Sequence, residues 1–122
     1  MIIIVGYSHA KDVEDRDATV AGFEAMVARA RTQDGCVDFA ITADSVDTTR
    51  SNILEIWRDE EAWKAWRKIA RGPRPRTIEH QVSLYRSDKV EKLSFLKKEA
   101  SSTVKPRTLS FTSGTYLLGQ CV

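Results

Sequence analysis

The chain has 122 residues, of which 42% are hydrophobic and 30% are charged, and its formal net charge is +2. This length suits one domain that buries about two thirds of its unfolded surface. The 19 basic and 17 acidic residues are too balanced to indicate a nucleic-acid or anionic-membrane partner. Two cysteines, Cys36 and Cys121, give neither a disulfide framework nor a metal-ligand spacing, so we predict no metal and a reduced, cytoplasmic setting.

The first segment, residues 2–9, is predicted to be a central strand because its apolar β-formers run continuously at the start. A period of two places Tyr7 and His9 on one face. The apolar start is too short for a signal peptide or a membrane span. A charged connection over residues 11–17 and a cover helix over residues 18–32 are expected to follow.

Two further strands are predicted over residues 36–42 and 52–58, joined as an antiparallel hairpin by a polar turn. In the first of them Val37, Phe39 and Ile41 alternate onto one face. The second contains Asn52, Glu55 and Trp57 and runs almost without a loop into a helix.

That helix, residues 59–71, is predicted from its N-cap and its apolar spacing. Asp59 is a good N-cap, and Trp63 and Trp66 lie on one helical face. Gly72 and Pro73 then end the helix.

A fourth strand over residues 77–86 places His80 on its more apolar face. The order β-α-β-β-α-β predicts an α+β, ferredoxin-like fold, with a four-stranded antiparallel sheet and two helices on one face. This domain spans residues 1–88. Residues 89–122 are an extension, with a helix over residues 89–100 and a Ser/Thr-rich hairpin or tail over 101–122.

The sheet face opposite the helices carries apolar groups that need cover. We therefore expect a homodimer, a dimeric α+β barrel in which two sheets enclose a pocket. Phe39 and Ile41, and also Leu54 and Ile56, are expected to face the helices. Glu55 and Trp57 would then line the pocket together with Tyr7 and His9, or with Ser8 of the same strand.

In that arrangement Trp57 stacks on a flat substrate and Glu55 or a histidine takes its proton. Burial raises the pKa of a carboxyl, and a histidine is the usual side chain for proton transfer near neutral pH, so His9 or His80 could supply the base. Each residue also has a structural interpretation. Trp63 and Trp66 can be core residues, and the two histidines can be exposed or held by structural hydrogen bonds.

Three stretches together resemble the antibiotic biosynthesis monooxygenase family over about residues 1–88. They are the turn and strand at 34–41, the polar turn at 44–50, and the run at 52–63 with Glu55, Trp57, Ala62 and Trp63. The resemblance implies oxygenation of an aromatic polyketide, phenol or quinol by dioxygen without metal, flavin or haem. The deprotonated substrate itself gives an electron to dioxygen.

By position, Trp57 and Trp63 match the tryptophan and the aromatic residue implicated in the polyketide-oxidising members. Those members have an asparagine four residues before the tryptophan, where this chain has Ile53. Asn52 lies one residue away, and a one-residue slip changes the face of a strand.

A haem-degrading branch of the same family uses a tryptophan on the second helix, where Trp66 falls. It also needs a first-strand asparagine, which Tyr7 replaces, and an iron-ligating histidine in the loop at residues 72–76, which has none. His80 comes later, on a strand. Haem degradation is therefore the poorer hypothesis.

Three functions remain open. The first is a cofactor-free monooxygenase with Glu55, Trp57, His9 and His80 as catalytic candidates. Its substrate-binding candidates are Tyr7, Asn52, Trp63 and Trp66. The second is a non-redox small-molecule-binding member of the dimeric barrel group, and the third is a dimerisation module.

Overall fold

In a computed structural model of the chain, the structure describes residues 1–95, and residues 1–90 form one compact unit. The elements follow the predicted order, with the first helical segment divided into two helices. They are β1 (Ile2–His9), α1 (Val13–Gly22), α2 (Glu24–Ala30), β2 (Cys36–Ala43), β3 (Arg50–Trp57), α3 (Glu60–Ile69) and β4 (Glu79–Arg86). Within residues 1–95, no helix is long and apolar enough to cross a membrane.

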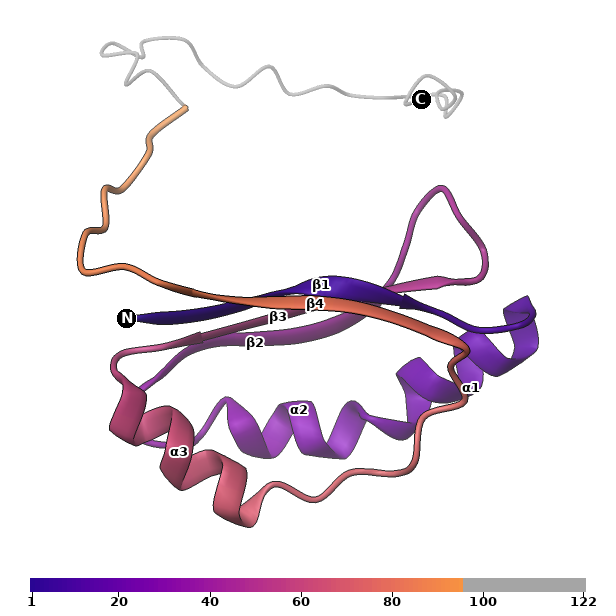
Figure 1. The fold of residues 1–122 in the computed structure, drawn as a ribbon, viewed down its shortest axis with the longest axis horizontal. Coiled ribbons are helices and arrows are strands. Elements are labelled where there is room, and N and C mark those ends of the chain that lie inside the picture. The colour runs from indigo at the N-terminus through magenta and orange to yellow at the C-terminus, as the bar shows by residue number, and fades with distance from the viewer. Residues whose placement is uncertain (96–122) are drawn as a thin grey trace, which may run out of the picture. The chain divides into compact units, whose positions relative to one another are not determined.

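The four strands form one antiparallel sheet in the order β2-β3-β1-β4, and the three helices lie against one face of it (Figure 1). This is the predicted ferredoxin-like α+β arrangement. The other face, called here the open face, carries no helix from residues 1–95. The register places on it residues from β1, β2 and β3, among them Val5, Tyr7, Ala40, Asn52, Leu54 and Ile56.

The first helix starts earlier than predicted. Asp12 caps α1, its carboxylate accepting the Asp15 backbone N–H at 2.8 Å, and Glu14 and Asp15 lie in the first turn. Acidic residues stabilise the positive end of a helix, so the charged stretch that we interpreted as a connection is the first turn of α1. The helical segment is also interrupted at Phe23, where α2 begins anew.

The hydrophobic core lies between the sheet and the helices. Trp57 is fully buried there and Trp66 is 3% exposed, and the rest of the core consists of Ile2, Ile4, Ala30, Phe39 and Ala62. Gly35 connects α2 to β2 with a φ of +85°, and an added Cβ would collide with Ala62. Glycine at this turn therefore lets α3 pack closely.

The prediction for the faces of β3 was wrong. Trp57 pairs with Ile2, and Glu55 pairs with Ile4 and Phe39, so both residues face the helices, while Leu54 and Ile56 lie on the open face. The reason is the size of the Trp57 side chain, whose ring is buried against Trp66. Burial of this large ring stabilises the fold more than burial of the two smaller residues, Leu54 and Ile56.

On β2, Phe39 faces the core as predicted, but Val37 is 59% exposed. A register shift between Cys36 and Asp38 removes Val37 from the alternation.

The helix predicted over residues 89–100 is absent from its described part, since residues 89–95 contain no helix. An amphipathic pattern rarely forms a stable helix without packing of its apolar stripe. Residues 96–100, and the hairpin or tail predicted over 101–122, lie outside the described residues.

Candidate functional site

The structure divides the predicted site residues between the two faces of the sheet. Glu55, Trp57 and His80 face the helices, and Trp63 and Trp66 reach the same side from α3. Tyr7, His9 and Asn52 lie on the open face. The sheet separates the two groups, so they do not form one site.

A cavity of about 380 Å³ lies between α3 and the sheet and is called here the α3 cavity. Most of its wall is apolar or aromatic, from Ile4, Met26, Phe39, Trp63, Trp66 and Ala70. Its two ionisable residues are Glu55 and Arg67. A cavity with apolar walls and a few polar groups is the usual form of a small-molecule site.

The aromatic wall of the cavity packs against further aromatic side chains of the core. Asp59 caps α3 by accepting the Ala62 backbone N–H at 2.8 Å, directly after β3 ends at Trp57. This short connection brings Trp66 onto Trp57, with ring centroids 6.0 Å apart and planes at 24°. Phe39 packs edge-on against both rings at 6.4 and 5.9 Å.

Glu55 is the half-buried carboxyl of the α3 cavity. Its Oε1 accepts a hydrogen bond from Trp57 Nε1 at 3.0 Å. Burial raises the pKa of Glu55, while the Trp57 hydrogen bond and the charge of Arg67 act in the opposite direction. Such a carboxyl holds its proton at a higher pH than an exposed one and can exchange it with a bound molecule.

The raised pKa of Glu55 predicts a pH dependence of stability. The native state favours the protonated carboxyl, so this contribution is fully present below the ordinary value of 4.5 and is lost as pH rises through the native pKa. Glu55→Gln should therefore lose less stability than the wild type between about pH 4 and about pH 8. Denaturant unfolding at one protein concentration measures this difference.

The matched control for this prediction is Glu61→Gln, which makes the same charge change on the exposed side of α3. It should follow the wild-type pH dependence. If the free energy of unfolding changed with pH in the same way for wild type and Glu55→Gln, the native environment would not raise the pKa of the Glu55 carboxyl.

Arg67 was not singled out from the sequence. It stands one helical turn after Trp63, and its guanidinium carbon lies 5.3 Å from the centroid of the Trp63 ring. The spacing of four residues on a helix could have indicated this pair.

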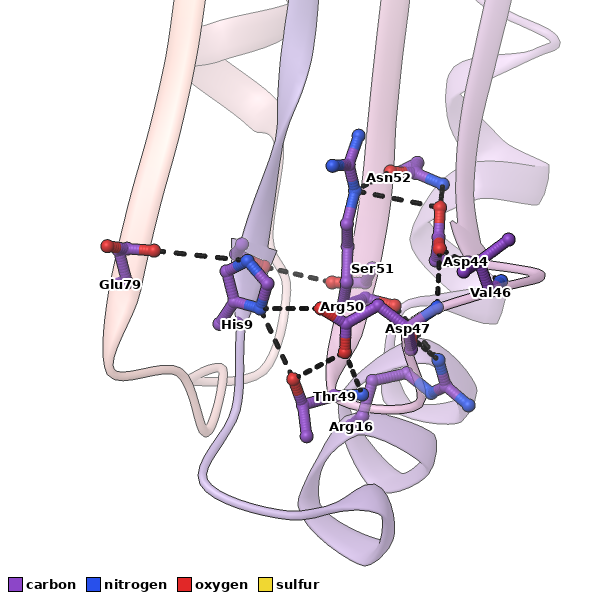
Figure 2. A network of polar contacts seen from close by, with 11 residues as sticks. His9, Arg16, Asp44, Val46, Asp47, Thr49, Arg50, Ser51, Asn52 and Glu79 are labelled. Atoms are coloured by element: carbon purple, nitrogen blue, oxygen red, sulfur yellow. Dashed lines mark hydrogen bonds and ion pairs between the residues drawn. The ribbon is translucent and has the colours of Figure 1, made fainter.

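Two of the open-face candidates, His9 and Asn52, belong to a polar network at one end of the sheet (Figure 2). His9 Nδ1 lies 3.2 Å from Thr49 Oγ1 and 3.6 Å from Asp47 Oδ2, and its Nε2 lies 3.9 Å from Glu79 Oε1. Hydrogen bonds from Thr49 lower the pKa of Asp47. His9 thus connects the turn before β3 to the start of β4.

Asn52 is engaged in the same network. Its Oδ1 accepts from Arg50 Nε at 2.7 Å, and its Nδ2 donates to Asp44 Oδ1 at 2.9 Å. That bond and two backbone N–H groups lower the pKa of Asp44 to about 2. The guanidinium of Arg50 also stacks on Tyr7, 4.1 Å from the ring centroid. These partners give Asn52 and Tyr7 a structural role in holding the 44–50 turn.

His80 is exposed and lies away from the α3 cavity. It borders a smaller cavity of about 60 Å³ near the hydroxyls of Ser8 and Ser51, which are hydrogen-bonded to each other at 2.9 Å. In the loop at residues 72–76, Arg76 is held in place, since its backbone N–H donates to Thr19 Oγ1 at 3.1 Å and its side chain lies 3.3 Å from Asp15.

Comparison with solved structures supports the fold. A candidate antibiotic biosynthesis monooxygenase from Nitrosomonas europaea matches with a TM-score of 0.58 and 16% identity, covering 73% of this chain and 100% of that chain. One from Deinococcus radiodurans matches with a TM-score of 0.57 and 15% identity, covering 77% and 99%.

A haem degrader from Mycobacterium tuberculosis, with two haems bound in its active site, has the same fold. Its TM-score is 0.53 at 10% identity, covering 75% of this chain and 100% of that chain. At these identities the likeness shows the fold alone.

No curated protein sequence matches the chain. The sequence model of the family described as "Antibiotic biosynthesis monooxygenase" matches residues 1–70, which is more than half of the sequence. The chain belongs to the antibiotic biosynthesis monooxygenase family.

Proposed function

We propose that the protein is a cofactor-independent monooxygenase that oxidises a phenolic, quinol or polyketide-like aromatic molecule with dioxygen in the α3 cavity. One observation carries the proposal: a half-buried carboxyl of raised pKa, Glu55, lines a cavity whose other walls are mostly aromatic and apolar. The family membership agrees with this chemistry. The site is on the helix side of the sheet, whereas the sequence led us to expect it on the open face.

The aromatic walls bind and orient the flat ring of the substrate. Trp63 and Trp66 offer ring surfaces, and Phe39 with Ile4 closes the cavity on the sheet side. Aromatic groups prefer offset or edge-on contact with such walls. A volume of about 380 Å³ falls within the range of sites for small organic ligands.

Glu55 then acts as the general base. It removes the proton from the phenolic hydroxyl, and the resulting phenolate is electron-rich enough to transfer one electron to dioxygen. The two radicals combine into a peroxide, which loses water. For a substrate whose reacting carbon is a methylene, one oxygen atom becomes a carbonyl and the other leaves as water with the two hydrogens of that carbon.

The test is oxygen uptake with a panel of hydroquinones and anthrones. The proposal expects consumption of one dioxygen per substrate molecule, with no added metal, flavin or haem. Binding that raises the melting temperature without oxygen uptake would instead favour a non-redox binding protein. Neither binding nor uptake would favour a dimerisation module.

Haem degradation is the less favoured activity. Of the chain's two histidines, His9 is held by the open-face network and His80 borders the small cavity near Ser8, so neither lines the α3 cavity. A haem in that cavity would lack a histidine to bind its iron. The likeness to the mycobacterial haem degrader extends only to the fold.

We also propose that the protein is a homodimer joined through the open faces. Val5 and Leu54 are cross-strand neighbours at the centre of this face, and Ala40 pairs with Leu54 from the other side. An apolar sheet face of this kind is typically buried in an interface.

Cys36 carries a free thiol whose pKa is raised by burial, which suits the reducing, cytoplasmic setting that we propose.

Leu54→Glu is expected to shift the protein from dimer to monomer at micromolar concentration, because it buries a charge at the centre of the interface. Sedimentation equilibrium measures the change, and circular dichroism checks that the variant is folded. Val46→Glu, in an exposed turn, is the matched control and should remain a dimer. A wild-type protein that sediments as a monomer would contradict the proposal.

A further inference from the structure

Arg67 differs from Arg58 and Arg86 in its bonding. Arg58 and Arg86 form ion pairs with Asp34 and Glu60, at 3.1 and 2.8 Å. Arg67, in the last turn of α3, makes no hydrogen bond or ion pair with any residue that the structure describes. Its guanidinium instead lies over Trp63 at the wall of the α3 cavity.

A favourable position in the helix dipole does not account for this placement. A basic residue in the last turn stabilises a helix, and Lys68 supplies that charge as well. The dipole requires neither a position over Trp63 nor a place on the cavity wall. The N–H groups of Arg67, which have no partner among the described residues, are available to a planar acceptor such as a carboxylate.

We propose that Arg67 binds an anionic substituent of the substrate, so that the substrate class is a hydroxyaryl carboxylate. This inference rests on the proposed function, because it concerns the same α3 cavity. The carboxylate pairs with Arg67, the ring lies against Trp63, and the hydroxyl reaches Glu55.

The charges allow only one orientation of such a ligand. Arg67 is close enough that its charge lowers the pKa of Glu55, and the half-buried Glu55 would repel a second anion placed against it. The neutral hydroxyl therefore goes to Glu55 and the carboxylate to Arg67. Arg67 thus sets both the choice of substrate and its direction in the cavity.

The test compares two probes that share a ring and a hydroxyl but differ in charge, 6-hydroxy-2-naphthoate and its methyl ester. Isothermal titration calorimetry at low salt should give wild-type protein about tenfold tighter binding of the acid than of the ester. Arg67→Gln should remove this preference, because the affinity for the acid should fall by about tenfold more than the affinity for the ester. Arg67→Lys should retain part of it, because it keeps the charge but not the planar fork.

Arg74→Gln, in the loop outside the cavity lining, is the control for the loss of one positive charge and should keep the wild-type preference. Equal wild-type affinity for acid and ester, or an unchanged preference in Arg67→Gln, would overturn the role of Arg67 and leave the proposed function standing. Failure of the wild type to bind either probe would also overturn the role of Arg67, while oxygen uptake with the panel of hydroquinones and anthrones would still decide the proposed function.

Discussion

Trp66→Ala is expected to lower the free energy of unfolding by about 3–5 kcal/mol, the usual cost of truncating a buried aromatic residue to alanine. Trp66 is 3% exposed and contacts the rings of Trp57 and Phe39, so its removal leaves a void that these neighbours cannot fill by small shifts. Denaturant unfolding at fixed protein concentration gives the value.

Trp63→Ala is the matched control, since it removes the same side chain from the same helix. Trp63 is only half-buried, and it packs at the edge of the core, so its loss should cost clearly less. Equal losses for the two variants would show that Trp66 does not hold α3 against the sheet.

Glu55→Gln is expected to lower the turnover number for a phenolic or quinol substrate by about 10²–10⁴-fold, the usual contribution of a general base. Glutamine keeps the shape of the side chain and an acceptor oxygen for Trp57 Nε1, but it cannot take a proton. Oxygen uptake under saturating substrate measures the loss.

The wild-type rate should rise with pH through the raised pKa of Glu55, and this rise should be absent from the residual rate of Glu55→Gln. Glu61→Gln serves again as the control and should keep full activity. Wild-type turnover in Glu55→Gln would remove Glu55 from the mechanism while leaving the cavity as a binding site.

The fold was predictable from short-range patterns in the sequence. The alternation of residues in β1 and β4 determines their faces, and Asp59 followed by an acidic first turn marks the start of α3. These signals lie within a few residues of one another. The start of α1 was missed because a charged first turn has the composition of a loop.

The site depended on contacts that no local pattern contains. On β3, both alternating sets contain apolar residues, and only the partner Trp66, brought over by α3, selects Trp57 for the helix side. Glu55 follows Trp57 to that side because a strand has a period of two. The choice of Glu55 and Trp57 as a pair was therefore accessible from the sequence, and their face was not.

The position of the site is tested most directly by a crystal structure of the protein with bound 6-hydroxy-2-naphthoate. Our account predicts the ring between α3 and the sheet, beside Trp63, with its hydroxyl within hydrogen-bond distance of Glu55. A ring bound on the open face, beside Arg50 and Tyr7, would contradict it.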